Sequence, residues 1–271
     1  MGNLVRMDLF KLRKTKMFFV FAAIILAVTI ILPIVGKIFA GVLLNILESA
    51  SGDAQALAEA KMLVAQYNKP YLLSDVLRAP MGGLSMLWML LFVSASSFMY
   101  LDVANGYVKN VAGQLPTRGH LAVSKLIVVY CHNLVLMLVG LVGSLIGYGV
   151  TRGFTLDDAI GAGLLEFFLK LLLTGDLSAL LLLFTTGFRN KTLAIVSSVI
   201  LGMGMMSLVY MPLGFALGKL FRTEVDLMPY MPDQMLLAAN INVWAALAEG
   251  VGMTLLFLFL TTYCVNKRDV Q

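Results

Sequence analysis

The chain has 271 residues, of which 60% are hydrophobic and 13% are charged, and its mean hydropathy is +0.90. Soluble domains contain about 45–50% apolar and about 25% charged residues, so this composition excludes an ordinary soluble domain and predicts a membrane protein. The net charge is +5, but the basic residues gather beside apolar segments, where membrane topology accounts for them. We therefore exclude nucleic acid as a partner.

Residues 1–16 combine cations with apolar side chains. In the stretch NLVRMDLFKLRKTK, Arg6, Lys11 and Arg13 are interspersed with apolar residues such as Phe10. This mixture predicts a helix that lies in the lipid headgroup region, and the alternative is an ordinary basic flank of a membrane span. We favour the interfacial helix because the apolar residues lie among the cations.

Six apolar segments follow, and each approaches or exceeds the roughly 20 residues that a spanning helix needs. They cover residues 17–36, 82–101, 125–150, 159–188, 193–211 and 243–265. An even number of spans puts both termini on one side, and Lys and Arg next to the span ends place that side in the cytoplasm. The sequence therefore predicts an all-α integral membrane protein, with one transmembrane domain over residues 1–271 and both termini cytoplasmic.

Three connections have a character of their own. The outer loop 47–81 contains a stretch rich in Ala, Leu, Glu and Gln that predicts an amphipathic helix outside the membrane. The cytoplasmic loop 102–124 predicts a short helix over Val103–Gln114. The outer segment 212–242 has three prolines but is too apolar for a solvated loop, so we expect part of it to re-enter the membrane as broken helices.

The third segment carries small residues at the spacing of helix contacts. Gly140, Gly143, Ser144 and Gly147 form a small-xxx-small series, which allows close approach of another helix. We expect this helix to belong to the same chain rather than to a second copy.

The sequence lacks the common motifs of nucleotide and metal sites. The nearest stretch to a phosphate-binding loop, Thr185–Thr192, reads TTGFRNKT and lacks both glycines of that motif. His120 and His132 cannot form a metal site alone, and Cys131 and Cys264 both lie in apolar segments. We therefore expect a chain that is not itself an enzyme and that binds no cofactor.

Four ionisable residues fall inside the apolar segments, where each costs about 3 kcal/mol or more and is a functional candidate for that reason. Glu166 and Lys170 are four residues apart, which favours an ion pair on one helix face. Whether this pair sets helix register or lines a transport path stays open.

The other two ionisable candidates are acids beside glycines. Asp176 follows Gly175 in an apolar run of roughly 30 residues, which is longer than a straight span needs. A helix break there would make Asp176 an N-cap. Glu249 lies near the outer end of the last segment, followed by Gly250 and Gly252, which would let another helix or a ligand approach. The alternative for Glu249 is a side chain that reaches the outer interface.

Two stretches carry a resemblance to a known family. The opening LVRMDLFKLRKTKMFF, the segment ANGYVKNVAGQLPTRGHLAVSKLIV and the six-span plan resemble type-2 permeases of ABC (ATP-binding cassette) exporters. The similarity is greatest to permeases of bacterial antimicrobial-peptide immunity and of phenol-soluble-modulin-like peptide-toxin export. It extends over essentially the whole chain.

The resemblance implies a permease in the bacterial plasma membrane that pairs with a second permease, identical or not. Separate ABC ATPase subunits would bind ATP and magnesium and contact the interfacial helix and the first cytoplasmic loop. In the helix these contacts correspond to Arg6, Phe10, Lys11 and Arg13. In the loop they correspond to Val103, Asn105, Gly106, Tyr107, Val108, Lys109 and Asn110.

The many Met, Phe and Leu residues suit an adaptable path for amphipathic or antimicrobial peptides. Two other classes of function use the ionisable residues instead. A membrane-embedded enzyme would use Asp176 with Glu249 or Glu166. A proton- or sodium-coupled carrier would use Glu166, Lys170 and Glu249 without ATP, although the inverted repeats typical of such carriers are not apparent.

Overall fold

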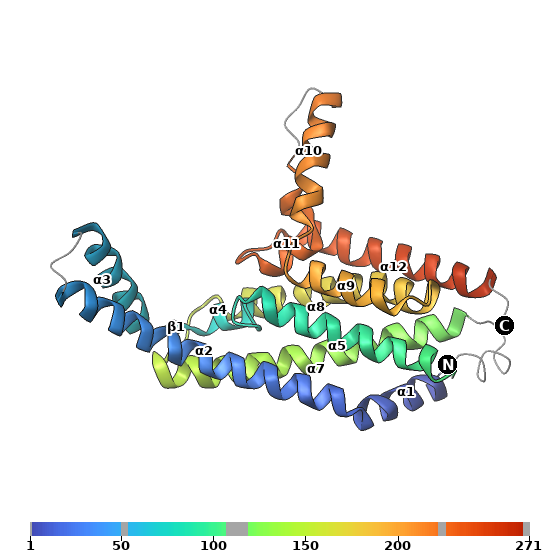
Figure 1. The fold of residues 1–271 in the computed structure, drawn as a ribbon, viewed down its shortest axis with the longest axis horizontal. Coiled ribbons are helices and arrows are strands. Elements are labelled where there is room, and N and C mark those ends of the chain that lie inside the picture. Colours follow the sequence, from blue (N-terminus) through green and yellow to red (C-terminus); the bar gives the residue numbers. More distant parts are fainter. Residues whose placement is uncertain (1, 50–53, 107–118, 222–225, 268–271) are drawn as a thin grey trace. The chain divides into compact units, whose positions relative to one another are not determined.

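The computed structural model describes residues 2–49, 54–106, 119–221 and 226–267 (Figure 1). These residues are predominantly helical. The helices are α1 (Gly2–Lys14), α2 (Lys16–Ser49), α3 (Ala54–Asn68), α4 (Leu73–Arg78), α5 (Ser85–Ala104), α7 (Gly119–Thr151), α8 (Ile160–Leu182), α9 (Lys191–Gly202), α10 (Ser207–Phe221), α11 (Pro232–Leu237) and α12 (Val243–Lys267). A π-helical turn, Leu183–Gly187, continues α8, and a 3-10 turn, Met228–Tyr230, precedes α11. Two-residue strands β1 (Tyr71–Leu72) and β2 (Phe154–Thr155) pair in parallel, with Tyr71 opposite Phe154.

Several of these helices are long and apolar enough to cross a membrane. In the described part of the chain they are α2, α5, α7, α8 with its π-helical turn, and α12, and the bent pair α9–α10 makes a sixth if it is counted as one span. This architecture confirms the predicted all-α class and is compatible with a multi-pass membrane protein.

The helix bounds differ most from the predicted segments at two places. The first helix continues well beyond residue 36 to Ser49, and the ammonium group of Lys37 donates a hydrogen bond to the carbonyl of Thr151. The predicted span 193–211 is not straight, because α9 and α10 meet at an angle of 75°. Gly204 lies in the break with φ +69°, a conformation that ends helices and favours glycine.

The described chain groups into two compact units. One, called unit 2 here, consists of residues 22–82 and 137–167. Within it α7 packs closely against α2, since a Cβ atom on Gly147 would lie 2.8 Å from the carbonyl oxygen of Thr29. A Cβ atom on Gly143 would likewise lie 3.1 Å from the carbonyl oxygen of Leu26. The small-residue series therefore packs within the chain, as predicted.

The other unit, unit 1, consists of the described residues within 1–21, 83–136 and 168–271. Its α5 and α9 touch through small residues, with the Ser198 hydroxyl 3.0 Å from the Ser96 hydroxyl. A Cβ atom on Gly202 would lie 2.9 Å from the Cβ of Met89. Large buried side chains fill the surrounding core: Trp88, Leu91, Phe92, Met99, Leu136, Leu173, Leu177 and Leu181.

Candidate functional site

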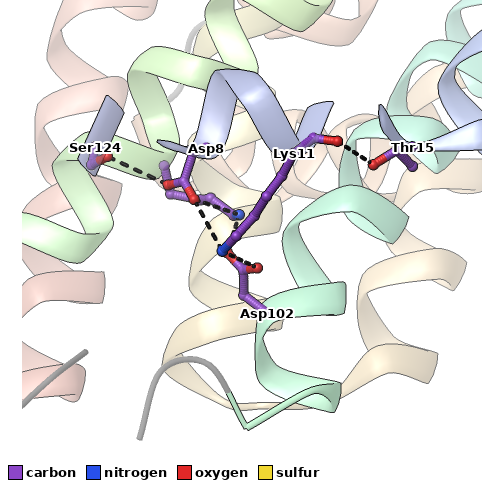
Figure 2. Close-up of polar contacts among 6 residues, drawn as sticks. Asp8, Lys11, Thr15, Asp102 and Ser124 are labelled. Atoms are coloured by element: carbon purple, nitrogen blue, oxygen red, sulfur yellow. Dashed lines mark hydrogen bonds and ion pairs between the residues drawn. The ribbon is translucent and has the colours of Figure 1, made fainter. Parts of the chain in front are cut away.

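Unit 1 contains a cluster of two acids and two lysines where α1 meets α5 and α7. This junction cluster consists of Asp8, Lys11, Asp102 and Lys125 (Figure 2). Lys11 Nζ lies 3.2 Å from Asp102 Oδ1 and 3.5 Å from Asp8 Oδ1. Lys125 Nζ pairs with Asp102 Oδ2 and lies 4.0 Å from Asp8 Oδ1. Each ammonium group therefore contacts both carboxylates.

The amphipathic pattern of α1 explains how Asp8 enters this cluster. Leu4, Asp8 and Leu12 are four residues apart, share one helix face and are buried. The Ser124 hydroxyl of α7 donates to Asp8 Oδ2 at 3.4 Å. Near the C-terminal end of α1, the Thr15 hydroxyl donates to the Lys11 carbonyl at 2.8 Å (Figure 2). The face of α1 that carries Asp8 is thereby held against α7.

The balance of charge makes this burial tolerable. Asp8, Asp102 and Lys125 are all buried, and the Lys125 ammonium also lies 4.3 Å from the centre of the Phe98 ring. Buried charges are stable only when they are paired and hydrogen-bonded, and removal of one partner leaves an uncompensated charge. The cluster thus fixes α1 relative to the last turns of α5 and the first turns of α7.

A cavity of about 460 Å³ opens beside the junction cluster. Its wall combines the apolar side chains of Phe10, Phe98 and Leu101 with the charged side chains of Lys11, Lys14 and Asp102. Such a mixed wall suits an amphipathic segment or a lipid headgroup with part of its chain.

The predicted coupling residues lie in different places in the structure. Val103 lies in the last turn of α5, the backbone N–H of Asn105 donates to the Leu101 carbonyl at 3.0 Å, and Gly106 turns the chain with φ +66°. Tyr107, Val108, Lys109 and Asn110 lie outside the described residues. On α1, Arg6, Phe10 and Arg13 are exposed, whereas Lys11 belongs to the junction cluster.

Glu166 and Lys170 each have a partner that the sequence pattern did not reveal. In unit 2, Arg78 Nε lies 3.3 Å from Glu166 Oε1. In unit 1, Lys170 donates to the carbonyl of Ala238 at 2.9 Å. The spacing correctly placed Glu166 and Lys170 on one helix. Their partners Arg78 and Ala238 are remote in sequence, so no local pattern could indicate these contacts.

The structure contradicts the expected helix break at Asp176. Helix α8 is continuous through this residue, so Asp176 is no N-cap. The glycine before it serves helix packing instead, because the ring of Tyr130 lies where a Cβ on Gly175 would be. Asp176 is 1% exposed, and neither of its carboxylate oxygens has a hydrogen-bond partner in the described structure.

Helix α12 brings a second acid near Asp176. A Cβ on Gly250 would lie 2.5 Å from Leu172 Cγ, so α12 packs tightly on α8 next to Glu249. Leu172 lies one helical turn before Asp176 on the same face of α8, so Asp176 is on the face of α8 that packs against α12. Glu249 is half-buried and lines a cavity of about 370 Å³ together with Tyr230, Ala245, Ala248, Gly252 and Met253.

His132 belongs to a chain of buried polar side chains across unit 1. Its Nε2 lies 3.0 Å from the Ser94 hydroxyl, and its Nδ1 lies 3.1 Å from Asn133 Oδ1. The amide nitrogen of Asn133 in turn donates to the Ser178 hydroxyl at 2.9 Å and to the Thr174 carbonyl at 3.3 Å. These bonds satisfy a core histidine, and they tie α7 to α5 and α8.

Among the described residues, no group of three or more His, Cys, Asp or Glu side chains could hold a metal ion. Comparison of the chain with family models, with curated proteins and with solved structures finds no match. The function is therefore inferred from the residues and their geometry.

Proposed function

We propose that this chain is the membrane-spanning subunit of an ATP-driven exporter, with ATP and magnesium bound by a separate ABC ATPase subunit. The junction cluster is the observation that carries the proposal. It ties α1, the predicted interfacial helix, to residues on both borders of the loop predicted to contact the ATPase. A movement of that loop would therefore be transmitted to α1, α5 and α7 together.

The proposed setting follows from the predicted topology. The chain lies in the bacterial plasma membrane with both termini in the cytoplasm, where Arg6 and Arg13 on the exposed side of α1 face the lipid headgroups or the ATPase. A second permease subunit, the same chain or a related one, completes the path. Residues Tyr107 to Asn110 are the proposed contact with the ATPase.

Amphipathic peptides, including antimicrobial and toxin peptides, are the proposed substrate class. The chain contains 17 Met and 16 Phe residues, and Met side chains adapt to varied apolar surfaces. Large apolar residues are exposed along α12, such as Leu255 and Phe259. In the full complex these side chains would face lipid, the second permease or the peptide.

Purification of the tagged chain from its host in mild detergent tests the proposal. We expect an ATPase subunit to co-purify and amphipathic peptides to stimulate its hydrolysis. Tyr107→Ala combined with Lys109→Ala should release the ATPase, whereas Lys69→Ala in the predicted outer loop should not. A chain that purifies alone and without ATPase activity would contradict the exporter.

The unpartnered carboxyl group of Asp176 favours a second candidate, an ion-coupled carrier. Such a carrier would transport its substrate into vesicles in response to an ion gradient and without ATP. An intramembrane enzyme using Asp176, Glu166 and Glu249 would instead convert a substrate in the absence of any gradient. Because Asp176 is 1% exposed, a substrate bond has no room beside it in this conformation, which favours the carrier over the enzyme.

A further inference from the structure

Asp176 has an environment that does not suit a charged carboxylate. It lies in the C-terminal half of α8, is 1% exposed and has no hydrogen-bond partner for either oxygen in the described structure. No ion pair between described residues includes Asp176. A carboxylate without partners in apolar surroundings is so unfavourable that the group takes up a proton instead.

Three helices enclose this carboxyl group. Tyr130 of α7 lies over Gly175, and its phenolic oxygen is 3.5 Å from the Leu172 carbonyl of α8 and 3.4 Å from the Thr254 hydroxyl of α12. The close contact of Gly250 with Leu172 brings α12 against α8 at the same place. This packing leaves the Asp176 carboxyl no direct route to solvent.

Glu249 provides the connection to the outside of the bundle. It is half-buried beside Gly250 and lines the cavity of about 370 Å³ that also borders Gly252. Two like charges held near each other disfavour simultaneous ionisation. Asp176 and Glu249 together therefore hold one proton more readily than none.

We propose that Asp176 and Glu249 form a proton-binding site in which Asp176 holds the proton and Glu249 exchanges it with the cavity. Asp176 has no hydrogen-bond partner while α12 packs on α8, so the exchange requires α12 to loosen from α8. The O–H bond at Asp176 then breaks as one forms at Glu249, so Asp176 becomes the carboxylate and Glu249 the neutral acid. Glu249 then releases the proton to water in the cavity and returns to its charged form. Protonation of the pair would change how tightly α12 packs on α8.

Infrared spectroscopy of the purified full-length chain in an alkyl maltoside detergent, which has no carbonyl group of its own, tests the site. The carbonyl stretch of a protonated carboxylic acid should be present at neutral pH. It should be lost in Asp176→Asn, change frequency in Glu249→Gln and be unaltered in Asp158→Asn, where the acid is exposed. A band that persists in Asp176→Asn, or no band in the wild-type chain, would overturn the assignment.

Two further measurements keep the test decisive. If Asp176→Asn does not fold, isotope labelling of the aspartates in the wild-type chain shows whether an aspartate is the neutral acid, and an unshifted band would refute the proposal. Loss of the band when sodium replaces potassium would show that the site binds a sodium ion rather than a proton, and would refute the proposal. The chain is tested without any ATPase, so the outcome is independent of the exporter proposal.

Discussion

Lys125→Met is the sharpest test of the junction cluster. The substitution keeps the length of an apolar stem but removes the ammonium group that pairs with Asp102 and lies 4.0 Å from Asp8. Loss of one partner from a buried ion pair costs about 3–5 kcal/mol. Lys11 remains near both acids, but its side chain is 31% exposed. Solvent therefore screens its charge, and Lys11 compensates for the lost ammonium group only in part. We expect a loss of about 3 kcal/mol at the lower end of this range.

Thermal melting of the purified chain in one detergent measures this effect. For chains of this size about 1 kcal/mol corresponds to roughly 2–4 °C, so the melting temperature should fall by about 6–12 °C. Lys14→Met is the matched control, because Lys14 is exposed and contacts only the face of Phe10 among the described interactions. Its melting temperature should change by no more than about 2 °C.

A double substitution separates charge balance from side-chain packing. Asp102→Asn with Lys125→Met leaves one carboxylate, Asp8, opposite one ammonium group, Lys11, at 3.5 Å. We expect the double variant to recover about 1–3 kcal/mol relative to the sum of the single variants. Additive losses, or a Lys125→Met variant as stable as Lys14→Met, would refute the reasoning.

Three other outcomes follow from the packing and the buried acids. Gly250→Ala should lower the melting temperature by several degrees because its Cβ would meet Leu172, whereas Gly252→Ala, with nothing within 4 Å, should not. Burial raises the pKa of Asp233 above its ordinary value of 3.8. The folded chain therefore holds this proton more tightly than the unfolded chain, so the stability should fall as the pH rises from about 3.8 through the raised pKa. Asp233→Asn should flatten that pH profile, as seen by melting in an acidic buffer series. Asn133→Leu should destabilise by about 1–3 kcal/mol, because it leaves buried polar partners unsatisfied, and the same melting assay would contradict this if the variant matched wild type.

The sequence predicted the helices better than their ends. Long apolar runs identify spanning helices because each must cover a fixed thickness of hydrocarbon. The first predicted span ended at residue 36, but the Thr151 carbonyl accepts a hydrogen bond from the Lys37 ammonium group and the helix continues to Ser49. The break at Gly204 was missed because a single glycine inside an apolar run has no periodic signal.

The site depends on contacts that a sequence pattern cannot supply. Asp102 lies 91 residues from Lys11, and Asp8 lies 116 residues from Ser124. One local signal was available, since Asp8 lies midway between Leu4 and Leu12 on the face that α1 buries. Asp176 and Glu249 could be identified because acidic residues are rare in apolar segments. That α8 continues through Asp176 could not be predicted, because the packing of Tyr130 on Gly175 is a contact between residues remote in sequence.

The separation of Asp8 from its partners also sets an order of assembly. A ribosome makes α1 first, and the chain must grow by another 116 residues before Ser124 is present. Until then Asp8 has no buried partner on α7, and water or lipid headgroups at the membrane surface are the better environment for a carboxylate. We therefore expect α1 to stay at the surface during synthesis and to dock only after α5 and α7 are in place, which would make its docking a late step of folding.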